Sequence, residues 1–139
     1  MSVEISSRRL AADRNIHLDV FTGTFGITHL WTEAREFRRI FFDWPAAQIP
    51  VPMIYYKILV NRANNSGIVL IGVNNYHLTL EEIQSNGYIV CNDVADQISY
   101  VSWSRTNLVR GYSYACEVQD FLRAVPHVPG LESINTLLV

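Results

Sequence analysis

Apolar and polar residues change their spacing within the first 26 positions of this 139-residue chain. Residues 2–14 contain no Gly, Pro or aromatic residue and scatter their apolar side chains among Glu, Asp and Arg, which predicts a helix. Residues 16–26 then place apolar side chains at every second position and close on two glycines, a pattern typical of a strand. The chain therefore begins on a polar helix that has neither a cap nor a preceding turn.

Two long apolar runs dominate the middle of the sequence. Residues 49–61 (IPVPMIYYKILVN) and residues 66–75 (SGIVLIGVNN) are rich in β-branched and aromatic side chains, and the segment RANNSG that joins them carries turn residues. The pattern predicts a hairpin in which Met53–Val60 pairs with Gly67–Val73. Because both runs are apolar on both faces, we expect them in the centre of a sheet, with Ile54 and Leu70 buried.

The remaining segments are shorter and more polar. Residues 36–44 alternate less cleanly and stop at a proline, residues 88–91 (YIVC) predict a short strand, and residues 100–107 predict a loop or short strand. Thr79 stands where it would cap a short helix, and residues 116–125 predict a helix ended by Pro126. The last ten residues predict a final helix or an ordered tail. The sum is an α+β domain with a mostly antiparallel central sheet and peripheral helices.

Composition narrows the class of protein. The chain is 49% apolar and 17% charged with a formal net charge of −2, values that indicate one globular domain and exclude a wholly basic nucleic-acid surface. No apolar run reaches the length of a membrane span, and the first residues lack a signal-peptide pattern. Arginine supplies all the basic residues except Lys57, a bias compatible with contacts to phosphate.

Neither the histidines nor the cysteines form a recognisable catalytic or metal motif. The four histidines stand without a neighbouring nucleophile or metal-ligand spacing, which favours structural roles for them; they are His17, His29, His77 and His127. Cys91 and Cys116 lie 25 positions apart with no second Cys or His at zinc spacing. Residue chemistry alone leaves two alternatives for this pair, a disulfide or two buried thiols.

Glu4 and Arg8 are the one pair whose spacing suggests chemistry. Four positions apart on a helix, the two side chains project from the same face. They could form a surface ion pair worth a few tenths of a kcal/mol, about 0.3–0.5. The functional alternative is a carboxylate that holds a metal-bound water beside a guanidinium that meets the developing charge of a phosphate. Sequence physics favours the surface pair.

Five segments of the sequence, which follow one another in order, shift the balance toward the functional alternative for Glu4 and Arg8. They read LDVFTGTFGI, IPVPMIYYKILVN, GIVLIGVNNYHLTLEE, YIVCNDV and GYSYACEVQDF. Together they resemble the C-terminal half of the animal-type DNA/RNA non-specific endonucleases, the metal-dependent His-Me (ββα-metal) finger nucleases. The resemblance covers about residues 3–129. It implies cleavage of DNA and RNA with little sequence preference, one divalent ion such as Mg²⁺, and secretion.

The resemblance also assigns roles to individual residues. Val3-Glu4 with Arg8 matches the end of the family's catalytic helix, so that Glu4 would orient a metal-bound water and Arg8 would stabilise the pentacovalent phosphate. The blocks that contain Cys91 and Cys116 belong to a secreted family, which implies a disulfide between them. Weak nucleic-acid contacts are expected from two arginine clusters, namely Arg8, Arg9 and Arg14 in the first and Arg35, Arg38 and Arg39 in the second.

The rest of the family's catalytic pattern is missing from the sequence. It contains no Asp-Arg-Gly-His motif, which carries the general base, and its first Asn, Asn15, follows Arg8 instead of preceding Glu4. We therefore expect residues 1–139 to be the C-terminal part of one nuclease domain, truncated within the catalytic helix (residues 1–14), with its metal ligand upstream. Such a chain would be inactive alone and would need its missing half as partner.

Two further interpretations remain open. The chain could be a non-catalytic half-domain that binds nucleic acid or a protein partner, or a fragment without function. Losing a general base removes roughly 10²–10⁴-fold of rate, so intrinsic activity is not expected under any of them.

Overall fold

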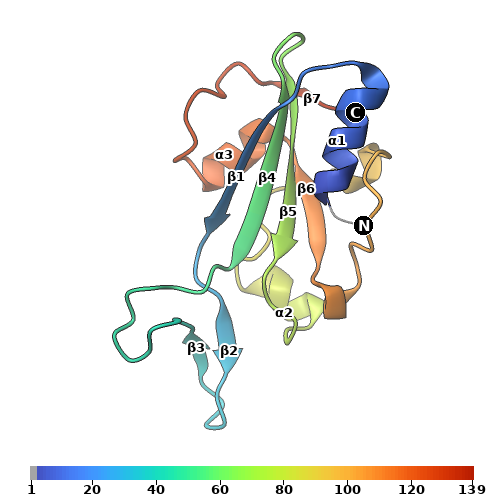
Figure 1. Cartoon of the computed structure of the whole chain (residues 1–139). Helices are drawn as coiled ribbons and strands as arrows, with labels where there is room; N and C mark the ends of the chain where they lie inside the picture. The colour runs from blue at the N-terminus through green and yellow to red at the C-terminus, as the bar shows by residue number, and fades with distance from the viewer. Residues whose placement is uncertain (1–2) are drawn as a thin grey trace.

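The computed structural model describes residues 3–139, with side chains described from Ser6 onward. Its central sheet has the strand order β1-β4-β5-β6, with β7 beside β5 (Figure 1). The elements of this sheet are β1 (Asp19–Phe25), β4 (Ile54–Asn61), β5 (Ser66–Val73), β6 (Ser113–Cys116) and β7 (Thr136–Leu137). The other elements are the helices α1 (Val3–Arg14), α2 (Leu80–Ser85) and α3 (Val118–Ala124), the 3₁₀ turns η1 (Ala95–Gln97) and η2 (Leu108–Arg110), and the strands β2 (His29–Trp31) and β3 (Phe37–Arg39).

The predicted hairpin forms the middle of the sheet. Strands β4 and β5 pair antiparallel from Ile54 opposite Val73 to Asn61 opposite Ser66. Every residue of β5 is buried, and Ile54 and Leu70 are 0% and 3% exposed. The prediction that this hairpin forms the buried centre of the sheet is thereby confirmed, although Tyr55 and Lys57 of β4 remain partly accessible on one face. The α+β class is confirmed as well, since all pairings in this sheet except β5 with β7 are antiparallel.

One face of the sheet is fully covered. Tyr56, Ile58 and Ile71 point into a core that also contains Tyr114 from β6 and Phe121 from α3. The rings of Tyr56 and Phe121 lie 4.9 Å apart, centroid to centroid. Side chains from β4, β5, β6 and α3 thus form one buried core on this face.

The opposite face is covered over only part of its length. Leu10 of α1 packs on a second cluster that includes Leu59, Ile68 and Ala115. Ser6 and Ser7 are also buried, so α1 presents small side chains to the sheet and can approach it closely. In Figure 1, α1 lies beside the upper part of the sheet, and the lower part of this face carries no helix.

Residues 26–53 form an arm that leaves the lower end of the sheet. Its strands β2 and β3 make a separate two-stranded sheet, and Figure 1 shows the arm projecting away from the body at the end opposite α1's C-terminus. A buried polar network fastens its base: the Asn75 amide donates to the carbonyl of His29 (2.6 Å) and to Thr28 Oγ1 (3.1 Å), and the Tyr88 hydroxyl lies 2.9 Å from Thr28 Oγ1. These hydrogen bonds join the base of the arm to the segments that follow β5.

Local predictions are confirmed at Thr79 and at the C-terminal end, and the strand predicted for residues 88–91 is wrong. Thr79 caps α2 with a full capping box, since its hydroxyl accepts from the Glu82 amide and the Glu82 carboxylate accepts from the Thr79 amide. Residues 88–91 are not a strand, because Tyr114 bonds this segment through its side chain: its hydroxyl donates to the carbonyl of Tyr88 and accepts from the amide of Val90. Of the two alternatives predicted for the last ten residues, the structure shows the ordered tail: it includes the short strand β7 and buries Leu131, Ile134 and Leu138. No helix in the part of the chain that the structure describes is long and apolar enough to cross a membrane.

Candidate functional site

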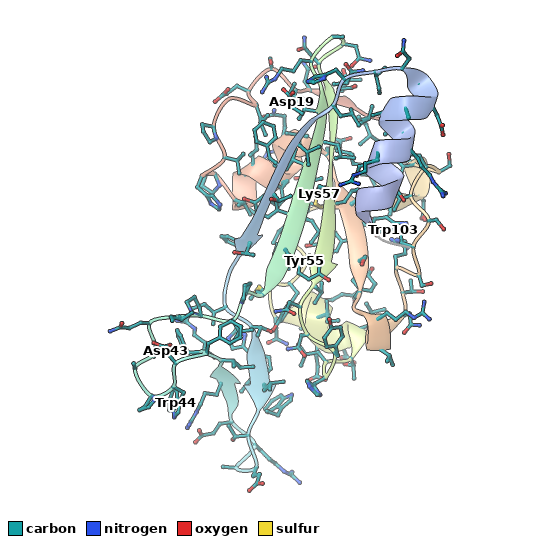
Figure 2. All side chains as sticks on the ribbon, viewed as in Figure 1. Asp19, Asp43, Trp44, Tyr55, Lys57 and Trp103 are labelled. Carbon is teal, nitrogen blue, oxygen red and sulfur yellow. A yellow bond between two sulfur atoms is a disulfide. The ribbon has the colours of Figure 1, made fainter. Side chains whose placement is uncertain are left out.

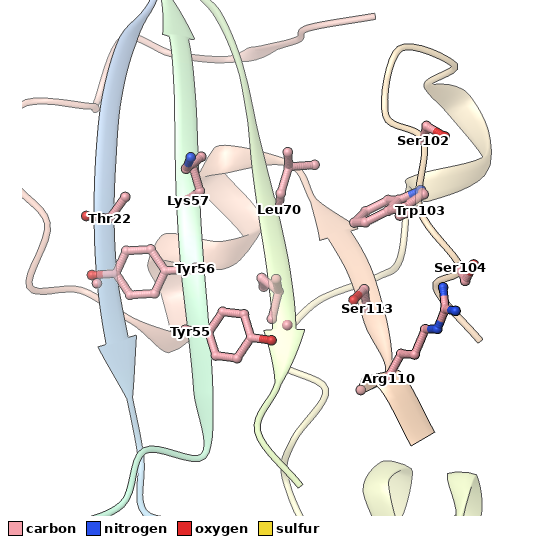
Figure 3. Close-up of a pocket in the computed structure, with 14 residues that line it drawn as sticks. Thr22, Tyr55, Tyr56, Lys57, Leu70, Ser102, Trp103, Ser104, Arg110 and Ser113 are labelled. Atoms are coloured by element: carbon pink, nitrogen blue, oxygen red, sulfur yellow. The ribbon is translucent and has the colours of Figure 1, made fainter. Parts of the chain in front are cut away.

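The uncovered part of the second sheet face is an open groove with a cavity volume of ≈ 590 Å³. Figure 3 shows that its floor comes from the sheet and its far wall from the segment between η1 and β6. The side chains that shape it are Thr22, Tyr55, Lys57, Leu70, Trp103, Arg110 and Ser113. A groove of this size holds a ligand as large as a nucleotide.

The floor of the groove is an aromatic ring that lies flat on the sheet. Tyr55 of β4 is directly opposite Gly72 of β5, and a Cβ on Gly72 would come within 2.3 Å of the Tyr55 ring. Glycine at position 72 therefore permits the ring to cross the neighbouring strand. The outer face of the ring stays accessible, since Tyr55 is 47% exposed. Burial of the rest of the side chain raises the pKa of its phenol, with a smaller effect from Tyr76, so the hydroxyl stays protonated at neutral pH.

Two cationic side chains flank this ring. Lys57 projects from β4 two positions beyond Tyr55, on the same face, and Arg110 ends η2 on the opposite wall (Figure 3). The side chain of Asn107 holds η2 in place by accepting from the amides of Val109 and Arg110. Among the residues whose side chains the structure describes, no carboxylate forms an ion pair with either cation. The groove therefore has a local positive charge that the net charge of the chain conceals.

The far wall is fastened to the sheet at both of its ends. Cys91 and Cys116 form a disulfide with a Cα–Cα distance of 5.8 Å, which confirms that pairing. Asp93, two positions after Cys91, accepts hydrogen bonds from the amides of Ala95 (2.9 Å) and Ala115 (3.2 Å) and pairs with Arg105. Trp103 and Arg110 both belong to the loop that the disulfide closes, so these covalent and polar links hold the wall opposite Tyr55.

A second hollow, ≈ 510 Å³ in volume, runs between α1 and residues 99–102. Arg9, Asp13 and Arg14 line it from α1, and Ser102 lines both this hollow and the groove. The hollow beside α1 thus adjoins the groove at Ser102, on its far wall. Figure 2 shows the start of α1 above the space between Lys57 and Trp103.

The structure describes the predicted catalytic pair only in part. Both residues belong to α1, but the side chain of Glu4 is outside the described residues, and its role remains a prediction. Arg8 is exposed on α1, as is Arg9. Arg14 has a structural contact, since its guanidinium lies over the Tyr100 ring and donates to the carbonyl of Val139 (2.5 Å).

The arginines predicted as a second nucleic-acid cluster lie far from the first. Arg35, Arg38 and Arg39 all belong to the arm, whereas Arg8, Arg9 and Arg14 belong to α1; Figure 1 shows the arm beyond the lower end of the sheet and α1 beside its upper part. The structure therefore does not bring the two clusters together. The groove with Tyr55, Lys57 and Arg110 lies between them.

The described residues do not fit a divalent metal ion on their own. No three His, Cys, Asp or Glu side chains in the described part of the chain gather as a protein-held metal requires. Two of the histidines, His29 and His127, contact aromatic side chains. His29 stacks on Phe37, and burial together with Arg39 lowers its pKa, while His127 lies 3.3 Å from the Tyr56 hydroxyl.

Sequence reasoning missed the groove residues. Lys57 is the only lysine in the chain and interrupts an apolar strand, which was a usable signal. Tyr55, Trp103 and Arg110 gave no signal, because they are far apart in the sequence and only the fold brings them to one cavity.

Comparison with known proteins points to one family. A family model described as DNA/RNA non-specific endonuclease matches residues 1–121. Among curated proteins, the salivary protein Tsal1 of Glossina morsitans morsitans is 27% identical over 128 residues, which cover 89% of this chain and 31% of that protein. The chain thus spans about a third of the length of this relative. No solved structure matches.

Proposed function

Because the chain belongs to the DNA/RNA non-specific endonuclease family, we propose that it engages nucleic acid along the groove and the adjoining face of α1. The family is a metal-dependent nuclease whose substrate is nucleic acid. The observation that supports the proposal is the placement of Lys57 and Arg110, two cations without an ion-pair partner among the described side chains, around the exposed ring of Tyr55. Cations meet phosphates, and an exposed ring stacks with a base.

We further propose that the chain is the second part of one nuclease domain, with residues 1–14 as the end of its catalytic helix. In this proposal Glu4 and Arg8 act in phosphodiester hydrolysis, and the guanidinium of Arg8 stabilises the charge that develops on the phosphate. The general base and the metal ligand are not supplied by this sequence, which has no Asp-Arg-Gly-His motif. The 139-residue chain is therefore proposed to be inactive alone.

A second candidate function is binding of nucleic acid without cleavage. The groove supports it, because the part of its lining that the structure describes contains cations, serines and aromatic rings but no histidine or carboxylate. Such a surface holds a strand by charge and stacking and offers no group that would activate water. Cleavage after completion of the domain separates the two candidates.

We propose that the protein is secreted. The disulfide Cys91–Cys116 and the salivary name of the Glossina relative support this, since structural disulfides form in oxidising compartments.

A plasmid-nicking assay tests the catalytic proposal. The chain with Mg²⁺ is expected to leave supercoiled plasmid intact. The same chain joined to an upstream family segment that carries the Asp-Arg-Gly-His motif and the metal-binding Asn is expected to nick it. Glu4→Ala and Arg8→Ala should each lower that restored rate at least tenfold, whereas the control Arg123→Ala on α3 should change it less than twofold.

Three outcomes contradict parts of the proposal. Chelator-sensitive cleavage by the chain alone shows that the catalytic residues are wrongly assigned. Restored cleavage that neither substitution lowers would show that Glu4 and Arg8 form only a surface ion pair. A completed domain that binds plasmid but never nicks it favours the binding function.

A further inference from the structure

The arm formed by residues 26–53 exposes aromatic side chains that the groove does not explain. Phe42 is 72% exposed and Trp44 is 61% exposed, although large aromatic rings contribute strongly to stability when buried. Both lie in the loop that follows β3, and Figure 2 shows Trp44 at the outer side of this loop, away from the sheet. These two rings therefore face water, whereas the aromatic side chains of the core, such as Tyr56 and Phe121, are buried.

The loop that carries these rings is held in one conformation by its own hydrogen bonds. The Asp43 carboxylate accepts from the amides of Gln48 (3.0 Å) and Ile49 (2.8 Å), and the amide of Phe42 donates to the carbonyl of Ile49 (2.8 Å). The hydrogen bonds from the amides of Ile49 and Gln48 hold the pKa of Asp43 below its usual value. The aromatic rings on either side of Asp43 are thus positioned before any ligand arrives, which lowers the entropic cost of binding.

A guanidinium completes this surface. Arg38 of β3 lies over the Trp44 ring, 5.8 Å from its centroid, and pairs with Glu36 at 2.6 Å. Arg39 follows it on β3, and Arg35 stands at the turn between β2 and β3. The arm therefore combines flat aromatic faces with three guanidinium groups, which match a ligand that repeats planar rings and negative charges.

We propose that the arm is a site for unpaired nucleotides, with Trp44 and Phe42 stacking on bases and Arg38 contacting the backbone phosphates. This inference rests on the proposed nucleic-acid function and adds a preference for single strands. A duplex shows its base faces only at its ends, so stacking on the arm requires unpaired bases. The arm joins β1 and β4 at the end of the sheet where Tyr55 lies, and Figure 2 shows Trp44 beyond that end, on the side of Tyr55 away from Lys57.

A membrane surface fits the arm less well. Glu33 and Glu36 are exposed on the arm and Asp43 is partly exposed, and insertion into a bilayer would take these carboxylates out of water. A nucleic-acid strand lying across the arm leaves them solvated.

Fluorescence anisotropy with the 139-residue chain in EDTA tests the proposal. The probes are a labelled 20-nucleotide oligothymidylate and a labelled 20-base-pair duplex. We expect the single strand to bind at least fivefold more tightly than the duplex. Trp44→Ala should weaken binding of the single strand about tenfold, which lies within the range measured for the loss of one stacked base. The same substitution should change duplex binding less than twofold.

Two further variants exclude a purely structural effect. Trp44→Phe keeps a stacking ring and should stay within threefold of wild type, while Arg38→Ala should lower the salt dependence of single-strand binding by about 0.7, the value for one phosphate contact. Arg123→Ala, on the covered side of the sheet, is the matched charge control and should change neither. Thermal unfolding of Trp44→Ala should match wild type, since the ring is mostly exposed.

The outcomes separate this inference from the proposed function. Equal affinity for both probes with no effect of Trp44→Ala overturns the arm site alone. A single-strand preference that depends on Trp44 but not on Lys57 and Arg110 overturns the groove and keeps the arm. No binding to either probe overturns both. If the chain sediments with phosphatidylserine vesicles and Trp44→Ala abolishes this without changing oligonucleotide binding, the arm binds a membrane instead. If sedimentation velocity shows a dimer that Trp44→Ala abolishes in the same way, the arm binds a second copy of the chain.

Discussion

Tyr55 and Tyr56 are neighbours on β4 and have opposite surroundings. Tyr56 is 6% exposed, packs against Phe121 and lies within hydrogen-bond distance of His127. Tyr55 is 47% exposed and lies over Gly72, between the cations of the groove. The strand alternates its side chains between two faces, so one residue serves the core and the next serves the surface.

The difference between the faces shows where function can reside. The face of Tyr56 is filled by α3 and by apolar side chains, and its residues contribute to stability. The face of Tyr55 is covered by α1 at one end and open at the other, where polar and cationic side chains replace apolar ones. A sheet face that is half covered provides a rigid floor and free space at the same time.

The largest expected effect is on the covered face. Tyr56→Ala should lower the free energy of unfolding by about 3–5 kcal/mol, because it leaves a cavity against Phe121. Tyr55→Ala should lower it by less than about 1.5 kcal/mol, since roughly half of that side chain already contacts water. Urea unfolding of the two variants measures both values. Equal losses would mean that the two faces do not differ as described.

Removing the disulfide should have the next largest effect. Replacing Cys91 and Cys116 together by Ala should cost about 3 kcal/mol, since the bond closes a loop of 25 residues in the unfolded chain. The measurement is urea unfolding of the oxidised wild type and the double variant. A cost below about 1 kcal/mol would show that the hydrogen bonds of Asp93 hold the groove wall without the covalent link.

The groove cations should affect binding and leave stability unchanged. Lys57→Ala combined with Arg110→Ala should weaken binding of the single-stranded oligonucleotide about tenfold at 0.1 M salt and lower the salt dependence by about 1.4, which is about 0.7 for each phosphate contact. Anisotropy titrations across salt concentrations test this, with Arg123→Ala as the control. Wild-type affinity in the double variant would remove the groove from the proposed function.

The smallest expected effect concerns the link between the arm and α2. The indole of Trp31 donates to the Glu82 carboxylate (2.6 Å), and this bond, with the Thr79 amide, holds the pKa of Glu82 below its ordinary value of 4.5. A lowered pKa in the folded state adds stability that is present above the unfolded value and is lost as pH falls through the folded one. Wild type should therefore be slightly more stable than Glu82→Gln at pH 7.

The same two proteins should become equally stable in acid. Unfolding at pH 7 and at several values below 4.5 measures the difference, and other titrating carboxylates cancel because both proteins contain them. A difference in the free energy of unfolding that stays constant with pH would show that the hydrogen bond from Trp31 adds no stability that depends on the charge of Glu82.

The sequence by itself determined the centre of this protein. The doubly apolar runs of β4 and β5 could only be buried by pairing within a sheet, and Thr79 with Glu82 specified the start of α2 through local hydrogen bonds. The family resemblance, carried by five ordered blocks, indicated the disulfide between Cys91 and Cys116. Each of these features depends on neighbours in the chain or on a strong repeated pattern.

Only the tertiary structure decided the groove and the arm. Residues 88–91 have a strand pattern, yet they pair with no strand, and the hydroxyl of Tyr114 bonds the carbonyl of Tyr88 and the amide of Val90. Tyr55 gains its position from Gly72 on the neighbouring strand and its facing wall from Trp103. Contacts between distant segments set these outcomes, and no local pattern of apolar and polar residues encodes which distant side chain will fill or leave open a given space.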